Sequence, residues 1–211
     1  MDILILSDSH GCYALAKKAL ELNPDVDAVI FLGDGARDME RLQSEGCHVP
    51  MYIVRGNCDL ASFEPEEAME AFDGHLVFFC HGHHYGVKYT LEDYAQHVKS
   101  VGAEIGLFGH THLPTLEQRA GVTLFNPGSI GAPRFGAPSY GLMKLKDDGT
   151  VEFEHRELTS LEKEKRQEAL DVLSAFLVVS SFAITLAVQN GKKRPLRACG
   201  PRRGVRGIAL V

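Results

Sequence analysis

Five short motifs carry side chains that can bind metal ions, and they follow one another along the chain. They are Asp8-Ser9-His10, Gly33-Asp34, Gly56-Asn57-Cys58-Asp59, His81-Gly82-His83 and Gly109-His110-Thr111-His112. Their main donors are two carboxylates, one carboxamide and four histidines, namely Asp8, Asp34, Asn57, His10, His81, His110 and His112. Oxygen and nitrogen donors of this kind suit Mn, Fe, Zn or Ni and argue against a thiolate cluster. Seven ligands are too many for one ion and suit a pair of ions.

The segments in front of the motifs show how these ligands are positioned. Four of the five motifs follow an apolar run that is typical of a strand, and each contains glycine or a tight turn. The strands expected near the motifs span Asp2–Leu6, Val26–Leu32, Val49–Val54, His75–Cys80 and Glu104–Phe108. Ligands at strand ends are held on rigid backbone, which a metal site needs if its geometry is to survive turnover.

The remaining segments predict the fold class. Helices are expected over Cys12–Leu22 and Asp38–Glu45, and a third, capped by Thr90, runs to about Val101. Asp73-Gly74 is a strong hairpin turn signal. From residue 115 the pattern is all-β, with strands at Thr115–Arg119, Val122–Phe125, Tyr140–Lys146 and Val151–Arg156 and a last turn at Asp148-Gly149. An early βαβ part and a late β part predict an α/β fold of two sheets packed face to face with helices outside.

Composition limits the compartment and the partners. With 45% hydrophobic residues the chain can bury one substantial core. The apolar run Ile3–Leu6 has no basic cluster before it, so we expect no signal peptide. The five cysteines form no CxxC pair, which favours reduced thiols and a cytoplasmic location. Residues 1–158 contain 24 acidic and 12 basic residues, and this acidic balance argues against long nucleic acid as a partner.

The order and spacing of the motifs resemble the calcineurin-like metallophosphoesterases, whose pattern is DxH, GDx, GNH(D/E), a histidine-containing turn and GHxH. The compact size, GNCD as the third motif and Asn126-Pro127-Gly128-Ser129 after the last one resemble the small bacterial and archaeal phosphodiesterase branch (YfcE-like). The resemblance implies a four-layer αββα sandwich of two mixed β-sheets flanked by helices. It also implies ligand roles: a first metal bound by Asp8, His10 and His112, a bridging Asp34, and a second metal bound by Asn57, His81 and His110.

The function implied by this resemblance is metal-dependent phosphoester hydrolysis. The expected enzyme is a phosphodiesterase that cleaves a small phosphoester by attack of a metal-bridging hydroxide on phosphorus. Its cofactors would be two divalent transition-metal ions, Mn2+ first, with Ni2+, Fe2+ or Zn2+ as alternatives. Two other hypotheses are a phosphomonoesterase or nucleotide phosphatase of this fold, and a protein-interaction scaffold resembling the retromer subunit of this fold. The physiological ester, the native metal and the existence of a homo-oligomer are left open.

One position departs from the family pattern. Many members place a histidine after the asparagine, as a general acid or transition-state stabiliser near the leaving group, whereas this chain has Cys58. A thiol is a poorer proton donor to a leaving alkoxide. We therefore expect His83 or Arg134 to substitute, or good leaving groups to be favoured. An inert turn thiol is an equal alternative for Cys58.

Groups behind the ligands must fix the histidine tautomers. Asp59 and the carbonyl groups near Gly82 and Thr111 are the candidates. Asn126–Ser129 either lines the site or is only a turn, because Pro-Gly is a strong turn dipeptide.

The end of the chain differs from the rest. We expect a metallophosphoesterase domain over 1–158, a helical extension over 159–188 and a basic, disordered tail over 189–211. The apolar stretch Ala175–Val188 is short for a bilayer span, so an interfacial or dimer-forming helix, a weak membrane anchor and a non-native extension all remain open. Because the motifs and strands end earlier, truncation after Glu157 is expected to leave a soluble, active enzyme.

Overall fold

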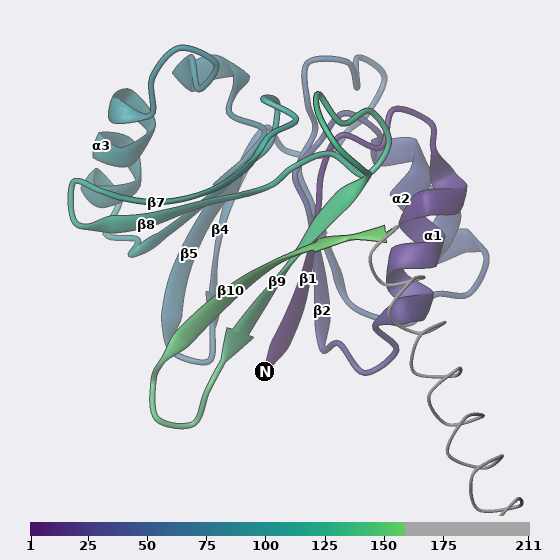
Figure 1. The fold of residues 1–211 in the computed structure, drawn as a ribbon, viewed down its shortest axis with the longest axis horizontal. Helices are drawn as coiled ribbons and strands as arrows, with labels where there is room; N and C mark the ends of the chain where they lie inside the picture. Colours follow the sequence, from purple (N-terminus) through teal and green to yellow (C-terminus); the bar gives the residue numbers. More distant parts are fainter. Residues whose placement is uncertain (159–211) are drawn as a thin grey trace, which may run out of the picture. The chain divides into compact units, whose positions relative to one another are not determined.

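The computed structural model describes residues 1–158 (Figure 1). The expectations for 159–188 and 189–211 fall outside the described residues and stay predictions. Within residues 1–158, no helix is long and apolar enough to cross a membrane.

The first sheet holds the N-terminal strands between two late ones. Its order is β10-β9-β1-β2-β3, formed by Val151–Glu157, Ser139–Leu145, Asp2–Leu6, Ala28–Phe31 and Met51–Ile53. The strands β1, β2 and β3 are parallel, β9 is antiparallel to its neighbour β1, and β10 is antiparallel to β9. The helices α1 (Tyr13–Leu22) and α2 (Ala36–Ser44) cover its outer face (Figure 1).

The second sheet has the same mixed character. Its order is β4-β5-β6-β8-β7, formed by Glu67–Phe72, His75–Cys80, Ile105–Phe108, Val122–Pro127 and Pro114–Arg119. The central strands β5, β6 and β8 are parallel, while β4 and β7 are antiparallel edges. The helix α3 (Glu92–Ser100) covers the outer face, and a short 3-10 helix, η1 (His83–Tyr85), follows β5 (Figure 1).

Three apolar clusters hold the layers together. The central one packs Ile5 of β1 against Phe79 of β5 and Leu107 of β6, between the sheets. The second joins the first sheet to α1 and α2, and the third joins the second sheet to α3. Alternate residues of the inner strands face opposite layers, so β1 is buried on both sides. The expected four-layer αββα sandwich of two mixed sheets is confirmed.

Most expected elements are present with ends shifted by a few residues. Asp73 and Gly74 have φ of 47° and 88°, the left-handed pair that a type I′ hairpin turn requires. The cap of α3 differs: the residue before the helix is Leu91, while the Thr90 hydroxyl accepts a hydrogen bond from Glu92 N at 3.2 Å. Thr90 therefore supports the first turn of α3 from the position before the cap, and it is not the cap itself.

The core extends one residue further than the strand pattern indicated. Leu158 is 6% exposed, belongs to the cluster beneath α1 and α2, and donates its N–H to Pro138 O at 2.9 Å. The expectation that the core is complete at Glu157 is therefore wrong by this one side chain.

A pair of truncations tests this boundary. A chain ending at Leu158 should fold and keep its activity. A chain ending at Glu157 should lose about 1.5–3 kcal/mol of unfolding free energy, because a buried leucine is removed. Denaturant titration of both proteins measures the difference. Equal stabilities would show that Leu158 adds nothing to the core, and inactivity of both chains would show that residues 159–211 are needed.

Candidate metal centre

The five motif loops meet at one edge of the sandwich. Each begins where a parallel strand ends: after β1, β2 and β3 in the first sheet, and after β5 and β6 in the second. The carboxyl ends of parallel strands in each sheet point the same way, so the loops are neighbours although they span more than a hundred residues.

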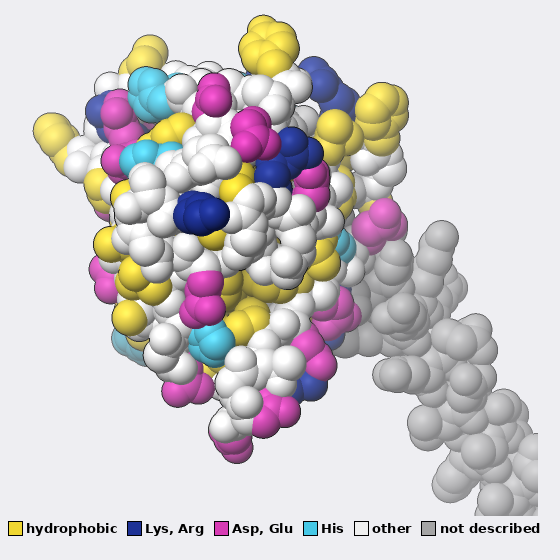
Figure 2. Space-filling view, turned by 90° about the vertical axis from the view of Figure 1, so that its left-hand side faces the viewer, with side chains coloured by type: hydrophobic (Ala, Val, Ile, Leu, Met, Phe, Trp, Pro, Cys, Tyr) yellow, Lys and Arg dark blue, Asp and Glu magenta, His cyan; other side chains and the backbone are white. Residues whose placement is uncertain are grey.

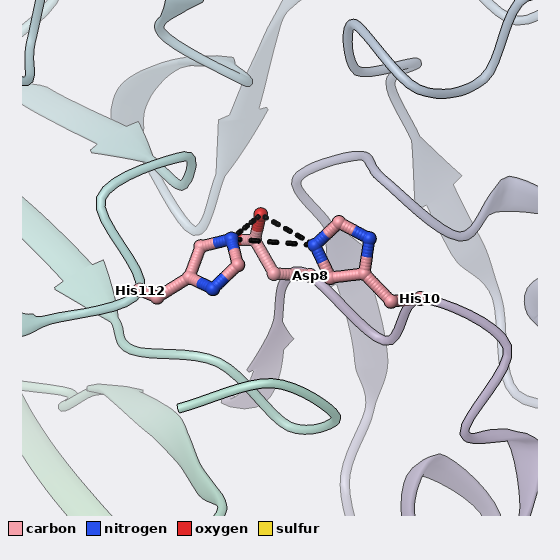
Figure 3. A group of neighbouring side chains, drawn as sticks. All are labelled: Asp8, His10 and His112. Atoms are coloured by element: carbon pink, nitrogen blue, oxygen red, sulfur yellow. Dashed lines mark hydrogen bonds and ion pairs between the residues drawn. The ribbon is translucent and has the colours of Figure 1, made fainter. Parts of the chain in front are cut away.

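The first ligand group is Asp8, His10 and His112, whose donor atoms come within ligand distance of one another (Figure 3). The two rings approach Asp8 from opposite sides, with their Nε2 atoms 3.3 Å apart. Asp8 Oδ1 lies 3.1 Å from His112 Nε2 and 3.8 Å from His10 Nε2. Asp8 Oδ2 points away and accepts hydrogen bonds from Ser7 Oγ and from the backbone N–H of His110. One oxygen is thus anchored while the other faces the rings.

The second group is Asp34, His81 and His110. His81 Nε2 lies 3.1 Å from His110 Nδ1 and 3.4 Å from Asp34 Oδ2. Asp34 Oδ2 is also 4.0 Å from His10 Nε2, so this oxygen faces both groups. The other oxygen, Oδ1, accepts the N–H of Cys58 at 2.7 Å. Asp34 therefore has the place of a bridging ligand, through one oxygen and not through two.

Two observations fit these groups to cations. Among the described residues, the buried side-chain atoms without a hydrogen-bond partner are Asp8 Oδ1 and His83 Nδ1, and both lie at this edge. Two nitrogens bound to one ion at about 2.1 Å lie roughly 3.0–3.4 Å apart, which matches the separations in both histidine pairs. A buried carboxylate oxygen without a partner, such as Asp8 Oδ1, is costly unless a cation or proton compensates it.

Burial and neighbouring groups also shift the pKa values of the candidate ligands. Burial raises the pKa of Asp34, but His81 and the Cys58 N–H outweigh it, so the pKa lies below its usual range. Burial lowers the pKa of His81, and contact with Asp34 more than reverses this. Contact with Asp8 raises the pKa of His112, whereas burial and the charges of His81 and Lys88 lower the pKa of His110 to about 4. Metal ions must displace any protons held on these rings.

The ligand loops have strained backbone. Seven non-glycine residues among those described have positive φ, and two of them, Asp73 and Ala120, lie in hairpin turns. The other five are all candidate ligands: Asp8, His10, Asp34, His110 and His112. Left-handed backbone costs on the order of 1–3 kcal/mol per such residue and concentrates at functional sites. Sequence patterns did not indicate this strain.

The groups behind the ligands differ from those expected. The acceptors that orient the rings are Leu32 O for His81 Nδ1, at 2.7 Å, and Ala132 O for His112 Nδ1, at 2.5 Å. The tautomer role expected of Asp59 is wrong, because its carboxylate accepts four backbone N–H groups, from Asp34, Gly35, Ala36 and Gly56. Asp59 thereby ties the Asp34 loop to its own loop and caps the start of α2.

The Asn126–Ser129 segment supports the ligand loops from behind. Both of its polar ends are fully buried. Asn126 Nδ2 donates to Gly109 O at 2.8 Å and to the Thr111 hydroxyl at 3.0 Å. The Ser129 hydroxyl donates to Asp8 O and accepts the N–H of Ala132. The segment is therefore more than a turn, and it holds the loops of both ligand groups.

Two further candidates, Cys58 and Asn57, belong to the third motif. Cys58 can complete a third donor group with His10 and Asp34, and burial and the nearby Asp34 raise the pKa of its thiol to about 11. Asn57 is exposed and donates its amide N–H to Cys58 Sγ at 3.3 Å. Its amide oxygen accepts no hydrogen bond within residues 1–158, so it is available to a cation.

The two substitutes proposed for the missing histidine differ in position. The His83 ring lies 5.5 Å from that of His81 and 6.1 Å from that of His110, centroid to centroid. Burial and the neighbouring His84 lower the pKa of His83. Arg134 is exposed and lines a small cleft beside the His110–His112 loop, and a guanidinium does not release its proton in proteins. His83 is thus the stronger proton-donor candidate.

Several site residues carry no motif signal. Asp38 is buried on α2 and accepts hydrogen bonds from the Ser9 hydroxyl and Gly11 N, which fixes the first loop. Arg37 lines a cleft of about 420 Å³ together with His10 and Cys58. The only sequence signal that could have marked Asp38 is its position four residues, or about one helical turn, after the candidate ligand Asp34.

Comparisons with known proteins agree with this geometry. Residues 1–148 match the model of the calcineurin-like phosphoesterase superfamily domain. The chain is 34% identical over 156 residues to a probable metallophosphoesterase, YsnB, of Bacillus subtilis, covering 72% of this chain and 90% of that one. It is 31% identical over 172 residues to the phosphodiesterase YfcE of Escherichia coli, covering 68% and 87%.

Solved structures share the fold. A predicted phosphoesterase from Streptococcus pneumoniae superposes with a TM-score of 0.61 at 24% identity, over 74% of this chain and 97% of that one. Vps29 from Entamoeba histolytica gives 0.57 at 20% identity, over 75% and 99%. The resemblance inferred from the five motifs is thus confirmed.

Proposed function

Since the chain belongs to the calcineurin-like phosphoesterase superfamily, we propose that it is a metal-dependent phosphodiesterase acting on a small phosphoester. The observation that carries the proposal is the pair of ligand groups joined by Asp34 Oδ2, together with the orphaned oxygen of Asp8. Two divalent transition-metal ions, Mn2+ first, would supply a nucleophile at neutral pH and neutralise charge on the phosphate.

The residues of the chain have distinct tasks in this proposal. Asp8, His10 and His112 would hold one cation, His81, His110 and Asn57 would hold the other, and Asp34 would contact both. The carbonyl groups of Leu32 and Ala132 fix the orientation of two of the rings, which raises ligand basicity. Asp59, Asn126 and Ser129 hold the ligand loops at strand ends, so the reacting groups meet in a preformed arrangement.

The shape and charge of the surface favour a small substrate. The cleft that contains His10, Asp34 and Cys58 has a volume of about 420 Å³, within the range of small-molecule sites. Figure 2 shows one face of the molecule, on the side of α3, where Lys and Arg side chains lie in separate small groups among acidic ones, without the continuous basic band typical of nucleic-acid binding.

The scaffold hypothesis shares the fold, because structures of Vps29 superpose on this chain. The donor groups favour the enzyme, since a scaffold needs neither strained ligand loops nor a carboxylate oxygen without a partner. Assays of purified protein against phosphomonoesters and phosphodiesters with Mn2+, Ni2+, Mg2+ or Zn2+ test the proposal. Diester hydrolysis with a transition metal is expected. No hydrolysis with any of these metals would favour the scaffold.

Cys58 leads to a prediction about the leaving group. Its raised thiol pKa makes it a weak donor to an alkoxide, so aryl phosphodiesters should be hydrolysed much faster than alkyl ones. Replacing the thiol with imidazole, Cys58→His, should narrow this gap by up to roughly a hundredfold or add monoesterase activity, with unchanged metal content.

Cys58→Ser is the matched control, because it keeps a small polar side chain without an imidazole. It should leave the aryl-to-alkyl ratio near that of the native enzyme. Equal aryl and alkyl rates in the native enzyme would contradict the prediction and identify another donor, with His83 the first to be replaced.

A further inference from the structure

A second, smaller cleft lies beside the metal centre, on the side of the His110–His112 loop. Its volume is about 160 Å³, and its walls include Phe108 and Thr111. Two charged residues line it: Lys88, from the loop before α3, and Arg134, from the loop between β8 and β9. Both residues are exposed, and the fold brings them from distant parts of the sequence to the same solvent-accessible cleft.

The positive charges in this cleft are not compensated by the protein. Within residues 1–158, seven of the twelve Lys and Arg residues form an ion pair with a glutamate. The side chains of Lys88 and Arg134 make no ion pair or hydrogen bond in that part of the chain. Two unpaired cations facing one hollow, in a part of the protein with twice as many acidic as basic residues, create a local anion-binding potential.

The cleft adjoins the ligand groups. Arg134 donates its backbone N–H to His112 O at 3.3 Å, and Thr111, in the cleft wall, stands between the two ligands in sequence. The cleft is thus built partly on the loop that carries two of the candidate ligands, so a second anionic group of a molecule bound at those ligands would face it.

We propose that Lys88 and Arg134 form a subsite for a second phosphate group of the substrate, one that is attached to the alcohol of the scissile diester. This inference rests on the proposed phosphodiesterase function. A guanidinium fork and an ammonium suit the oxygens of a phosphate. A cleft of about 160 Å³ is large enough for such a group. The substrate class is then a nucleotide-like diester with an additional phosphate, and selectivity lies in binding and not in the chemical step.

Two esters that differ by one group test the subsite. One is the p-nitrophenyl ester of thymidine monophosphate, and the other carries a further phosphate on the free sugar hydroxyl. The metal-loaded native enzyme should cleave the second with kcat/KM higher by roughly tenfold or more, mainly through KM, since a charged hydrogen bond contributes that much. Lys88→Ala, Lys88→Gln and Arg134→Ala should each move this ratio toward one, and Arg134→Lys should retain part of it.

The scissile bond is the same in both esters, so the ratio of their kcat/KM values within one variant does not depend on that variant's overall activity. Thermal unfolding checks that each variant is folded. Lys99→Ala is the matched control, since Lys99 is also exposed and unpaired among the described residues but lies on α3 and lines neither cleft. It should keep the native ratio. A native ratio of one or less, a ratio that the Lys88 and Arg134 variants leave unchanged, or a ratio lost equally in Lys99→Ala overturns the subsite. No hydrolysis of either ester overturns the proposed function as well.

Discussion

Removal of either central ligand should abolish turnover. Asp34→Ala deletes the oxygen that faces both donor groups, and His81→Ala deletes a fully buried ring nitrogen of the second group. A cation pair contributes several kcal/mol of charge stabilisation, so at about 1.4 kcal/mol per tenfold each variant should lose roughly a thousandfold or more in kcat/KM. Steady-state hydrolysis of an aryl phosphodiester at saturating metal measures the loss.

Replacing a histidine outside the site distinguishes the loss of a ligand from a general loss of folded protein. His48 is exposed and lies in the segment between α2 and β3, so His48→Ala should keep native activity. If Asp34→Ala or His81→Ala retained a tenth or more of the native kcat/KM, the ligand would not be needed for catalysis. If His48→Ala were as inactive as the ligand variants, the assay would be reporting the loss of folded protein.

Gly56→Ala should damage the site without removing any ligand. A Cβ at Gly56 would lie 2.1 Å from Asp34 Oδ1 and 2.6 Å from Asp34 N, closer than real Cβ contacts allow. The carboxylate must therefore move away from the Cys58 N–H that holds it. A displacement of about 1 Å in a catalytic arrangement costs roughly a hundredfold in rate, and this is the expected loss in kcat.

Gly102→Ala is the matched control. Gly102 has φ of 81° but no atom within 4 Å of an added Cβ, so the substitution costs backbone strain alone. It should lower stability by about 1 kcal/mol and leave kcat unchanged. Native kcat in Gly56→Ala would contradict the contact that the structure places at Asp34. A similar fall in kcat for both variants would show that strain, and not this contact, is responsible.

Local patterns were enough to bring out the candidate ligands but not to describe how the fold holds them. The apolar run Ile3–Leu6 predicts a buried strand from period and composition alone, and Asp8 and His10 then follow at its end. The left-handed backbone of Asp8 and His10 depends on hydrogen bonds to Gly33 O and Asp34 O, which are distant in sequence. No local propensity encodes such contacts.

The same limit explains the other differences. Asp59 lies next to Cys58 in a ligand motif, and this position suggested that its carboxylate fixes a histidine tautomer. The four backbone N–H groups that it accepts instead come from two loops that meet only in the folded protein. Lys88 and Arg134 had no shared signal, because 45 residues separate them and only the tertiary structure makes them line one cleft. Leu158 lies beyond the last strand, so no period marked it as core.

The number of metal ions bound per chain decides whether residues 1–158 form a two-metal centre. Protein stripped with EDTA, reconstituted with Mn2+ and freed of excess ion should contain two ions per chain by mass spectrometry of the metal. His48→Ala should match it, Asp34→Ala should contain fewer, and chelation should remove both the metal and the diesterase activity. At most one ion per native chain, or diester hydrolysis that persists in EDTA, would contradict the two-metal assignment of Asp8, His10, Asp34, Asn57, His81, His110 and His112.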